Sequence, residues 1–469
     1  MSKRNRKRWI GALLLVLLLA GLVLVPPALH RYQLARSAEL FRVQVEELRS
    51  LGQAVSTADL RLTPVPIENN AAVDLLAAAK ATQYDREEDA WGKLELGFPL
   101  RNDEKKSLEP LLADRLEVDR LVANALSKAG LDWQIQYQPQ LLDTLLPHLL
   151  QMRNLISQLR GEALVDASNQ RYDAAIERVH AIVMIADKLE YSPTFVGHLI
   201  ANSARTSACQ TLMSFLPALA IGDGKGEAGA AQVRALIALL LDESQTAIGL
   251  RRAIDSELVM QIGVTESALT YPNPEEFERK RTGVLNAVRT RLFPEDHGAS
   301  GRAFIRYMQS ARSAATHGNV LDMKANLPAQ PPEIDESVLL AMLLPNVTSV
   351  AEQHFEAIAN GRVAAVALAV RWYEIKQGRL PESLDELLPS FLTLLPTDPM
   401  TRGARLRYVA TGDRPMIYSV ARDGEDDEGR ERDPDSPRAE RQKYDIAANL
   451  RLQPRKPRTA VNNAPPSDD

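Results

Sequence analysis

An uncharged run of 21 residues near the N-terminus limits what this chain can be. The run extends from Trp9 to Leu29 and follows five Lys and Arg side chains within residues 3–8. At ~1.5 Å per residue, one helix of this length crosses the ~30 Å hydrocarbon core of a bilayer. The basic flank favours a cytoplasmic N-terminus (residues 1–8) and a transmembrane helix (9–29). We therefore expect a single-pass protein of the bacterial inner membrane with a periplasmic or extracytoplasmic bulk.

A cleaved signal peptide is the alternative interpretation, because such a peptide also begins with basic residues. Its apolar core is normally about 7–15 residues long and is closely followed by a small-x-small cleavage site. Here Pro26-Pro27 ends the apolar run, and the nearest such site, Ala35-Arg36-Ser37, lies farther downstream. The sequence favours the uncleaved anchor.

Composition narrows the functional classes. The chain of 469 residues is 45% hydrophobic and 25% charged, as is usual for proteins that bury a core. Its single cysteine, Cys209, excludes an internal disulfide framework and multi-cysteine metal sites. The net charge of −5 gives no basic footprint for nucleic acid. We therefore expect an acidic exported body that does not bind nucleic acid.

Apolar periodicity predicts a mainly α protein. A stripe at alternating spacings of four and three predicts a stalk helix over residues 30–62, ended by Thr63-Pro64-Val65-Pro66. The stripe consists of Leu34, Ala38, Phe41, Val45 and Leu48. It spans fewer than three heptads, so self-association through the stalk is possible and weak. Residues 63–345 form the predicted helical domain, in which Phe293–Ser337 reads as a long loop carrying one short helix (Phe304–Ala311).

The C-terminal third predicts a small α+β module over residues 346–450. A long helix, Val350–Gln377, ends at Gly378, which suits a left-handed cap. Two segments of period two, Arg405–Ala410 and Met416–Ala421, predict an antiparallel hairpin. Residues 451–469 read as a disordered tail.

Three patterns resemble catalytic or cofactor motifs but are incomplete. Gly224–Gly229 fits GxGxxG but follows a helical segment, where a dinucleotide site needs a strand. Cys209 and His198 are eleven residues apart, about three helical turns, so they do not form a thiol–imidazole pair. Glu177 and His180 have the Glu-x-x-His spacing of di-iron bundles without its second copy. We assign no catalytic residue and no cofactor-binding residue.

An acidic cluster, Asp423–Gly429, is the candidate metal site. Several carboxylates in one turn suit calcium, which takes six to eight oxygen ligands. As an EF-hand beginning at Asp423, the pattern fails at Glu428 and Pro434. A solvated acidic run remains the alternative.

The segment from Val363 to Asp445 resembles the C-terminal part of the major pseudopilins of type II secretion. The matching motifs are Arg371–Pro381, Ser383–Leu387, Pro396–Pro399, Arg407-Tyr408, Ile417–Ser419 and Arg422–Gly424. In that family the residues after the Tyr-Ser strand form a calcium loop closed by an Asp-Ile pair, which Asp445-Ile446 matches. The resemblance implies calcium ligation by Asp423, Asp426 or Asp427, and Asp445. The full chain is similar to uncharacterised bacterial envelope proteins with one span.

The resemblance covers about 80 of 469 residues, and the apolar run lacks the early glutamate of pseudopilins. A subunit that polymerises through its first helix is therefore not expected. Three functions stay open. The first is a non-catalytic interaction or scaffolding protein that binds an unidentified envelope partner. The second is a calcium-stabilised accessory subunit of a secretion or pilus-like system, and the third is an envelope hydrolase.

Overall fold

The computed structural model describes residues 3–82, 97–108, 115–270, 295–335, 346–431 and 444–453, with the backbone alone for residues 3–24, 334 and 335. Its α-helices are α1 (Lys3–Ser50), α2 (Ala71–Ala81), α3 (Asn102–Leu108), α4 (Arg115–Ser127), α5 (Pro147–Ser168), α6 (Tyr172–Leu189), α7 (Phe195–Phe215), α8 (Ala230–Leu241), α9 (Ser244–Thr270), α12 (His297–Ala314), α13 (Val320–Asn326), α14 (Pro332–Asp335) and α16 (Val347–Gln377). Short 3₁₀ helices are η1 (Ile67–Asn69), η3 (Leu141–Asp143), η4 (Leu216–Ala218) and η5 (Leu384–Leu387), and the strands are β1 (Arg407–Val409), β2 (Met416–Ser419) and β3 (Ile446–Asn449). The expectation of a mainly helical protein with a small antiparallel sheet is confirmed.

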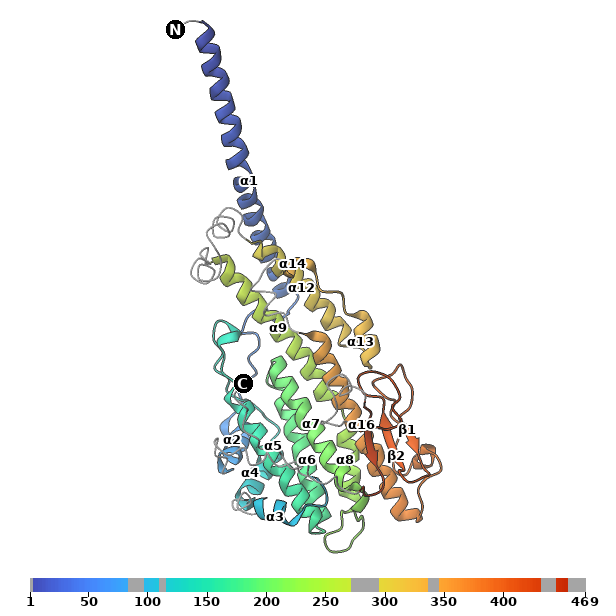
Figure 1. Cartoon of the computed structure of the whole chain (residues 1–469). Helices are drawn as coiled ribbons and strands as arrows, with labels where there is room; N and C mark the ends of the chain where they lie inside the picture. The colour runs from blue at the N-terminus through green and yellow to red at the C-terminus, as the bar shows by residue number, and fades with distance from the viewer. Residues whose placement is uncertain are drawn as a thin grey trace, which may run out of the picture.

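Helix α1 is unbroken over 48 residues and projects from one end of the helical body (Figure 1). Pro26 and Pro27 lie inside it, so the proline pair does not end the helix. The predicted stalk end at Thr63 is wrong, because the helix stops at Ser50. Gly52 then adopts a φ of 71°, and the Gln53 amide donates to the Leu48 carbonyl at 3.1 Å. A glycine in this left-handed conformation is a common helix stop.

In the part of the chain whose side chains the structure describes, no helix combines the length and the apolar composition needed to cross a membrane. Residues 9–24 of the predicted span lie outside that part, as do residues 454–469 of the predicted disordered tail.

The lower half of α1 packs onto α12. Phe41, Val45 and Leu48, three members of the apolar stripe predicted for the stalk helix, are buried there. Ser37 is buried at the same contact and accepts a hydrogen bond from Arg302 Nη1 on its Oγ at 3.0 Å. The stalk is therefore part of the body, and this stripe does not face solvent.

Helix α12 corrects the loop predicted for Phe293–Ser337. It spans His297–Ala314, and α13 follows at Val320–Asn326. Two small residues, Gly298 and Gly301, lowered the apparent helix propensity of this segment. A Cβ on Gly298 would lie 2.7–2.8 Å from the backbone of Ser37 and Ala38. The glycines thus permit close packing of α12 on α1. Because glycine has a low helix propensity, they also make the segment look less helical from its sequence.

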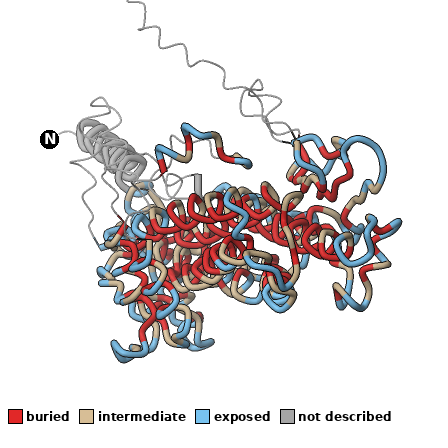
Figure 2. The backbone as a smooth tube through the Cα atoms, turned by 90° about the horizontal axis from the view of Figure 1, so that it is seen from below, coloured by how far each residue is buried: buried red, intermediate tan, exposed pale blue. Residues whose placement is uncertain are grey.

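One apolar core joins the helical body to the C-terminal segment. Its buried side chains run along the chain from Phe41 to Leu450, and Figure 2 shows them concentrated in the central helices. Helix α16 crosses this core, packing on α7 and α8 as well as on the sheet. Its cap is the predicted one, since Gly378 has a φ of 72°. The predicted division at residue 345 therefore separates chain segments whose side chains share one core.

The sheet has the order β1-β2-β3 and is antiparallel throughout. The predicted hairpin is confirmed, with Tyr408 opposite Ile417. The third strand was missed: β3 pairs with β2, and Ile446 lies opposite Ser419. The sequence of β3, Ile-Ala-Ala-Asn, does not alternate between apolar and polar residues, so the period-two pattern that marked the hairpin strands is absent from it.

Candidate functional site

A cleft of ≈ 1020 Å³ lies between the helical body and the C-terminal sheet. Two walls come from the C-terminal end of α7 and from the middle of α16. The opposite wall is formed by the loop after β2, by β3 and by the residues that follow β3. Its lining includes Phe98, Met213, Glu356, Arg414, Asp427, Glu428, Arg430, Glu431, Asp445, Arg451, Leu452 and Gln453.

Glu356 connects the two sides of the cleft. It lies on α16, and its Oε1 accepts a hydrogen bond from the hydroxyl of Tyr444 at 2.6 Å. Its other oxygen pairs with the guanidinium group of Arg422. The sequence identified this helix but gave no signal for the role of Glu356, because both partners come from 66 or more positions later in the chain.

Asp445 is the most buried carboxylate of the predicted calcium loop, with 2% of its surface exposed. Its Oδ2 accepts from the Gly429 amide at 2.8 Å, and its own amide donates to the Arg430 carbonyl at 2.7 Å. Its Oδ1 is buried without a hydrogen-bond partner. Burial, reinforced by the neighbouring charges of Asp426 and Asp427, raises the pKa of Asp445 to about 6. At Oδ1, the Asp445 carboxylate thus lacks a neighbouring positive charge or hydrogen-bond donor that would stabilise its ionised form.

The other three predicted ligands lie in the same loop but play different parts. Asp427 lines the cleft, and its Oδ2 is also buried without a partner. Asp426 accepts from the Tyr418 hydroxyl at 3.1 Å and pairs with Arg407 at 3.5 Å. Asp423 is exposed and does not line the cleft; burial and the charge of Asp427 raise its pKa.

Among the described residues, no group of three or more His, Cys, Asp or Glu side chains is arranged to hold a metal ion. Residues 432–443, which join the two halves of the predicted calcium loop, lie outside that set. The structure therefore brings two unpaired carboxylate oxygens to one wall of the cleft, and does not show a complete coordination shell.

A second polar cluster is enclosed in the helical body and does not line the cleft. His198 Nδ1 lies 2.7 Å from Glu190 Oε2, and Asn202 Nδ2 lies 3.0 Å from the other ring nitrogen. The ring of His354 lies 5.4 Å from that of His198, centroid to centroid. Burial lowers the pKa of His198 to about 3 and raises that of Glu190 well above its usual value. Sequence spacing did not pair His198 with Glu190, because Glu190 follows the last residue of α6 and His198 lies on the next helix, α7.

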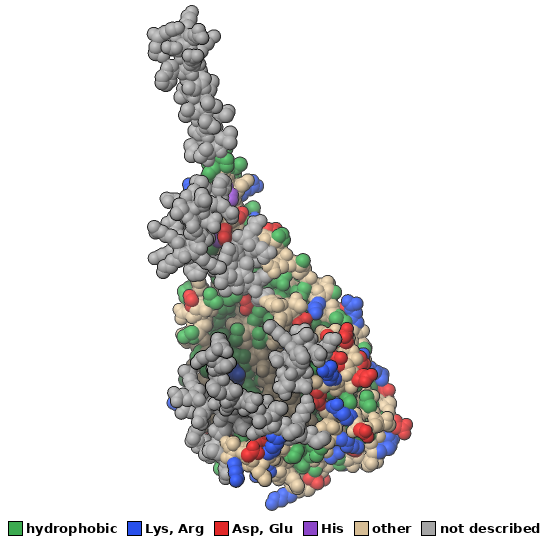
Figure 3. Space-filling model, viewed as in Figure 1, with side chains coloured by type: hydrophobic (Ala, Val, Ile, Leu, Met, Phe, Trp, Pro, Cys, Tyr) green, Lys and Arg blue, Asp and Glu red, His purple; other side chains and the backbone are tan. Residues whose placement is uncertain are grey.

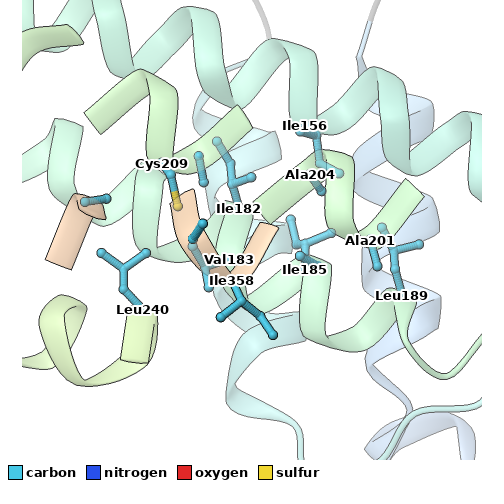
Figure 4. Close-up of a cluster of buried hydrophobic side chains, with 14 of the residues drawn as sticks. Ile156, Ile182, Val183, Ile185, Leu189, Ala201, Ala204, Cys209, Leu240 and Ile358 are labelled. Atoms are coloured by element: carbon cyan, nitrogen blue, oxygen red, sulfur yellow. The ribbon is translucent and has the colours of Figure 1, made fainter. Parts of the chain in front are cut away.

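The remaining sequence candidates are structural. Cys209 is fully buried among apolar side chains such as Ile182, Val183 and Leu240 (Figure 4), and burial raises the pKa of its thiol to about 12. The GxGxxG segment is a loop between η4 and α8, and the Gly226 carbonyl accepts from the Tyr172 amide at 2.7 Å. Neither arrangement supports nucleophilic catalysis or nucleotide binding.

Comparison with known proteins gives no relative: the chain matches no protein-family profile, no curated protein and no solved structure.

Proposed function

We propose that this is a membrane-anchored envelope protein with an interaction or scaffolding role. The observation that carries the proposal is the continuity of α1, which joins the apolar run Trp9–Leu29 to the body without a flexible link. The body begins at Ser37, eight residues after Leu29. At ~1.5 Å per helical residue, it would lie about 12 Å from the end of the span.

The exposed side of α1 supports the same proposal. Val25, Leu29 and Tyr32 are 55–65% exposed, and Figure 3 shows hydrophobic side chains where this helix leaves the body. Apolar residues at the end of a span would contact lipid, and a tyrosine suits the interface between lipid and water. Over the C-terminal module in the same view, basic and acidic side chains are interspersed, as on a surface that faces water.

Membrane fractionation with matched double substitutions tests the anchor. A lysine at the centre of a span costs about 2.5–3.5 kcal/mol, so Leu17→Lys with Leu18→Lys should move the chain out of the membrane fraction. Leu40→Lys with Val43→Lys adds the same charge on the exposed side of α1 below the span, and should leave the chain membrane-bound. Release of neither variant, or of both, would contradict the proposal.

Binding is favoured over hydrolysis because a nucleophile–base pair formed by described residues of the helical body is buried. Ser192 Oγ lies 2.7 Å from His148 Nε2, the geometry of a serine and its base. The two residues are only 2% and 4% exposed, Trp133 stacks on the imidazole, and neither residue lines the cleft. A substrate carbonyl could not reach this hydroxyl without opening the core.

The second candidate is a calcium-stabilised accessory subunit of a secretion or pilus-like system. The observation that favours it is the pair of buried, unpaired oxygens, Asp427 Oδ2 and Asp445 Oδ1. Carboxylate oxygens are the donors that calcium prefers, and a bound cation would remove the cost of burying them unpaired. Asp427 and Asp445 would be the two carboxylate ligands of the ion, whereas Asp426 is engaged by Arg407 and Tyr418 and Asp423 lies outside the cleft.

Thermal unfolding of the full chain in detergent, with calcium and then with chelator, tests this candidate. A ligand at ~100 times its Kd adds about 2.7 kcal/mol if it binds only the folded state. Asp445→Asn should abolish the upward shift, whereas Asp413→Asn, in the exposed hairpin turn, should retain it. An identical shift in both variants, or none in the unmodified chain, rejects a calcium site. Normal secretion in a deletion strain would reject the accessory role.

A further inference from the structure

The cleft has a negative charge that its own arginines do not neutralise. Five carboxylates and three guanidinium groups are among its lining side chains. Glu356 is paired with Arg422 and Glu431 with Arg414, whereas Arg451 turns to Glu374, which does not line the cleft, at 2.6 Å. The lining carboxylates outside these pairs are Asp427, Glu428 and Asp445. Glu428 is exposed at the rim, and Asp427 Oδ2 has no hydrogen-bond partner. The cleft therefore favours a cationic occupant.

The chain itself leads out of this cleft. Arg451, Leu452 and Gln453, the last described residues, all line it. The next five residues in the sequence are Pro454-Arg455-Lys456-Pro457-Arg458, and no acidic residue follows until Asp468. An extended, proline-containing segment advances ~3.1 Å per residue, so its three cations stay within about 15 Å of Gln453.

The cleft also offers apolar surface suited to proline. Phe98, Leu452 and Met213 of α7 line it, and none of the three is fully buried. Proline-rich segments with the spacing Pro-x-x-Pro dock on aromatic side chains at low entropic cost, because their extended conformation is already formed. Pro454 and Pro457 have that spacing, and basic residues lie between and after them.

We propose that the cleft is a docking site for the chain's own C-terminal segment, Pro454–Arg458. The cations of this segment face Glu428, Glu431 and Asp427, and its prolines face Phe98. Because the two parts belong to one chain, the effective concentration is in the millimolar range, and weak contacts suffice. The inference does not depend on the membrane anchor, and so the two can fail separately.

Limited trypsin digestion of the full chain tests the docking. Arg455 and Arg458 are cleavage sites, and docking should protect them. Glu428→Gln with Glu431→Gln removes two rim charges while keeping the side-chain shape, and should speed cleavage by about tenfold, the factor that ~1.4 kcal/mol of docking free energy gives. Asp413→Asn with Glu382→Gln removes the same charge from exposed positions outside the cleft, and should leave the rate unchanged.

A spin label gives an independent readout that needs no protease. The label is placed at Ala460→Cys, and Cys209 does not compete because it is fully buried. We expect slow label motion in the unmodified background, fast motion in the rim variant or at high salt, and slow motion in the control. Equal cleavage and equal mobility in all three chains would overturn the proposal. Loss of protection in the control variant would also overturn it. So would competition with added Pro-rich peptides in which a neutral peptide displaces the C-terminal segment as effectively as a basic one.

Discussion

Arg302 Nη1 donates to Ser37 Oγ at 3.0 Å, a hydrogen bond between residues 265 positions apart. It joins α12 to α1 at the level where α1 enters the body, and Arg302 also donates to the backbone carbonyl of Ser37. A guanidinium group held by two acceptors fixes both the height and the rotation of the helix. The position of the N-terminal helix relative to the body is thus set by a partly buried contact.

Gly301→Ala should destabilise the junction between α1 and α12. A Cβ at Gly301 would lie 2.7 Å from Thr265 Cγ2 and 2.9 Å from the Phe41 ring, so the packing must open. Overpacking of this kind costs about 1–3 kcal/mol. Chemical denaturation in detergent measures the effect. Gly263→Ala is the control, because nothing lies within 4 Å of its added Cβ, and helix propensity predicts a gain of about 0.5–1 kcal/mol. Equal effects at the two positions would reject the predicted close packing.

Asp398→Ala should unfold the C-terminal sheet before the rest of the body. Asp398 is buried and accepts hydrogen bonds from Ser419 Oγ at 2.7 Å, from the Val420 amide and from the Met400 amide. Removing the carboxylate leaves three buried donors unpaired, at about 1–3 kcal/mol each. Hydrogen exchange at β2 reports the loss. Asp413→Ala, at an exposed turn, should leave exchange unchanged, and unaltered exchange in Asp398→Ala would contradict the assignment.

Acidification below pH 6.5 should destabilise the fold through its buried histidines. Burial lowers the pKa of His148 to about 4 and that of His198 to about 3. Between pH 6.5 and these values the unfolded chain binds protons that the folded chain does not, so stability falls as pH falls. Replacing one such histidine by a group that does not titrate, as in His148→Gln, should flatten the decline between pH 7 and pH 5. An unchanged slope in urea denaturation would count against the burial of this ring.

Glu257 should act in the opposite direction. Burial raises its pKa to about 7, so the folded chain holds a proton that the unfolded chain releases above its ordinary pKa. The contribution of Glu257 to stability is therefore present at low pH and is lost as pH rises toward 7. Glu257→Gln should make the protein relatively more stable above pH 7 than the unmodified chain. A variant that is destabilised equally at pH 5 and pH 8 would show that the carboxylate has a different role.

Local patterns predicted those parts of the fold that depend on nearby residues. Gly378 ends α16 as expected from the left-handed cap that the sequence predicted. The hairpin of β1 and β2 follows from its own alternation. Each of these signals lies within a few positions of the structure that it specifies, and so a single sequence is enough to recognise it.

Contacts between distant segments were not predictable in the same way. Helix α12 was not recognised because of the glycines that pack against α1, and β3 was not recognised because Ile-Ala-Ala-Asn has no alternation of apolar and polar residues. At the site, the sequence identified Asp427 and Asp445 through their resemblance to a calcium loop, but it gave no sign of Glu356. Glu356 faces the loop only because α16 crosses the core between the helical body and the sheet.

The N-terminal residue of the mature chain tests the central claim most directly. Signal-peptide cleavage at Ala35-Arg36-Ser37 would cut α1 beside Ser37 and break the contact with Arg302. Intact mass measurement on the membrane fraction should find residues 9–29 retained. In a separate sample, protease added from the periplasmic side should digest the body. A mature chain that begins near Ala38 and is recovered in the soluble periplasmic fraction would contradict the anchored scaffold.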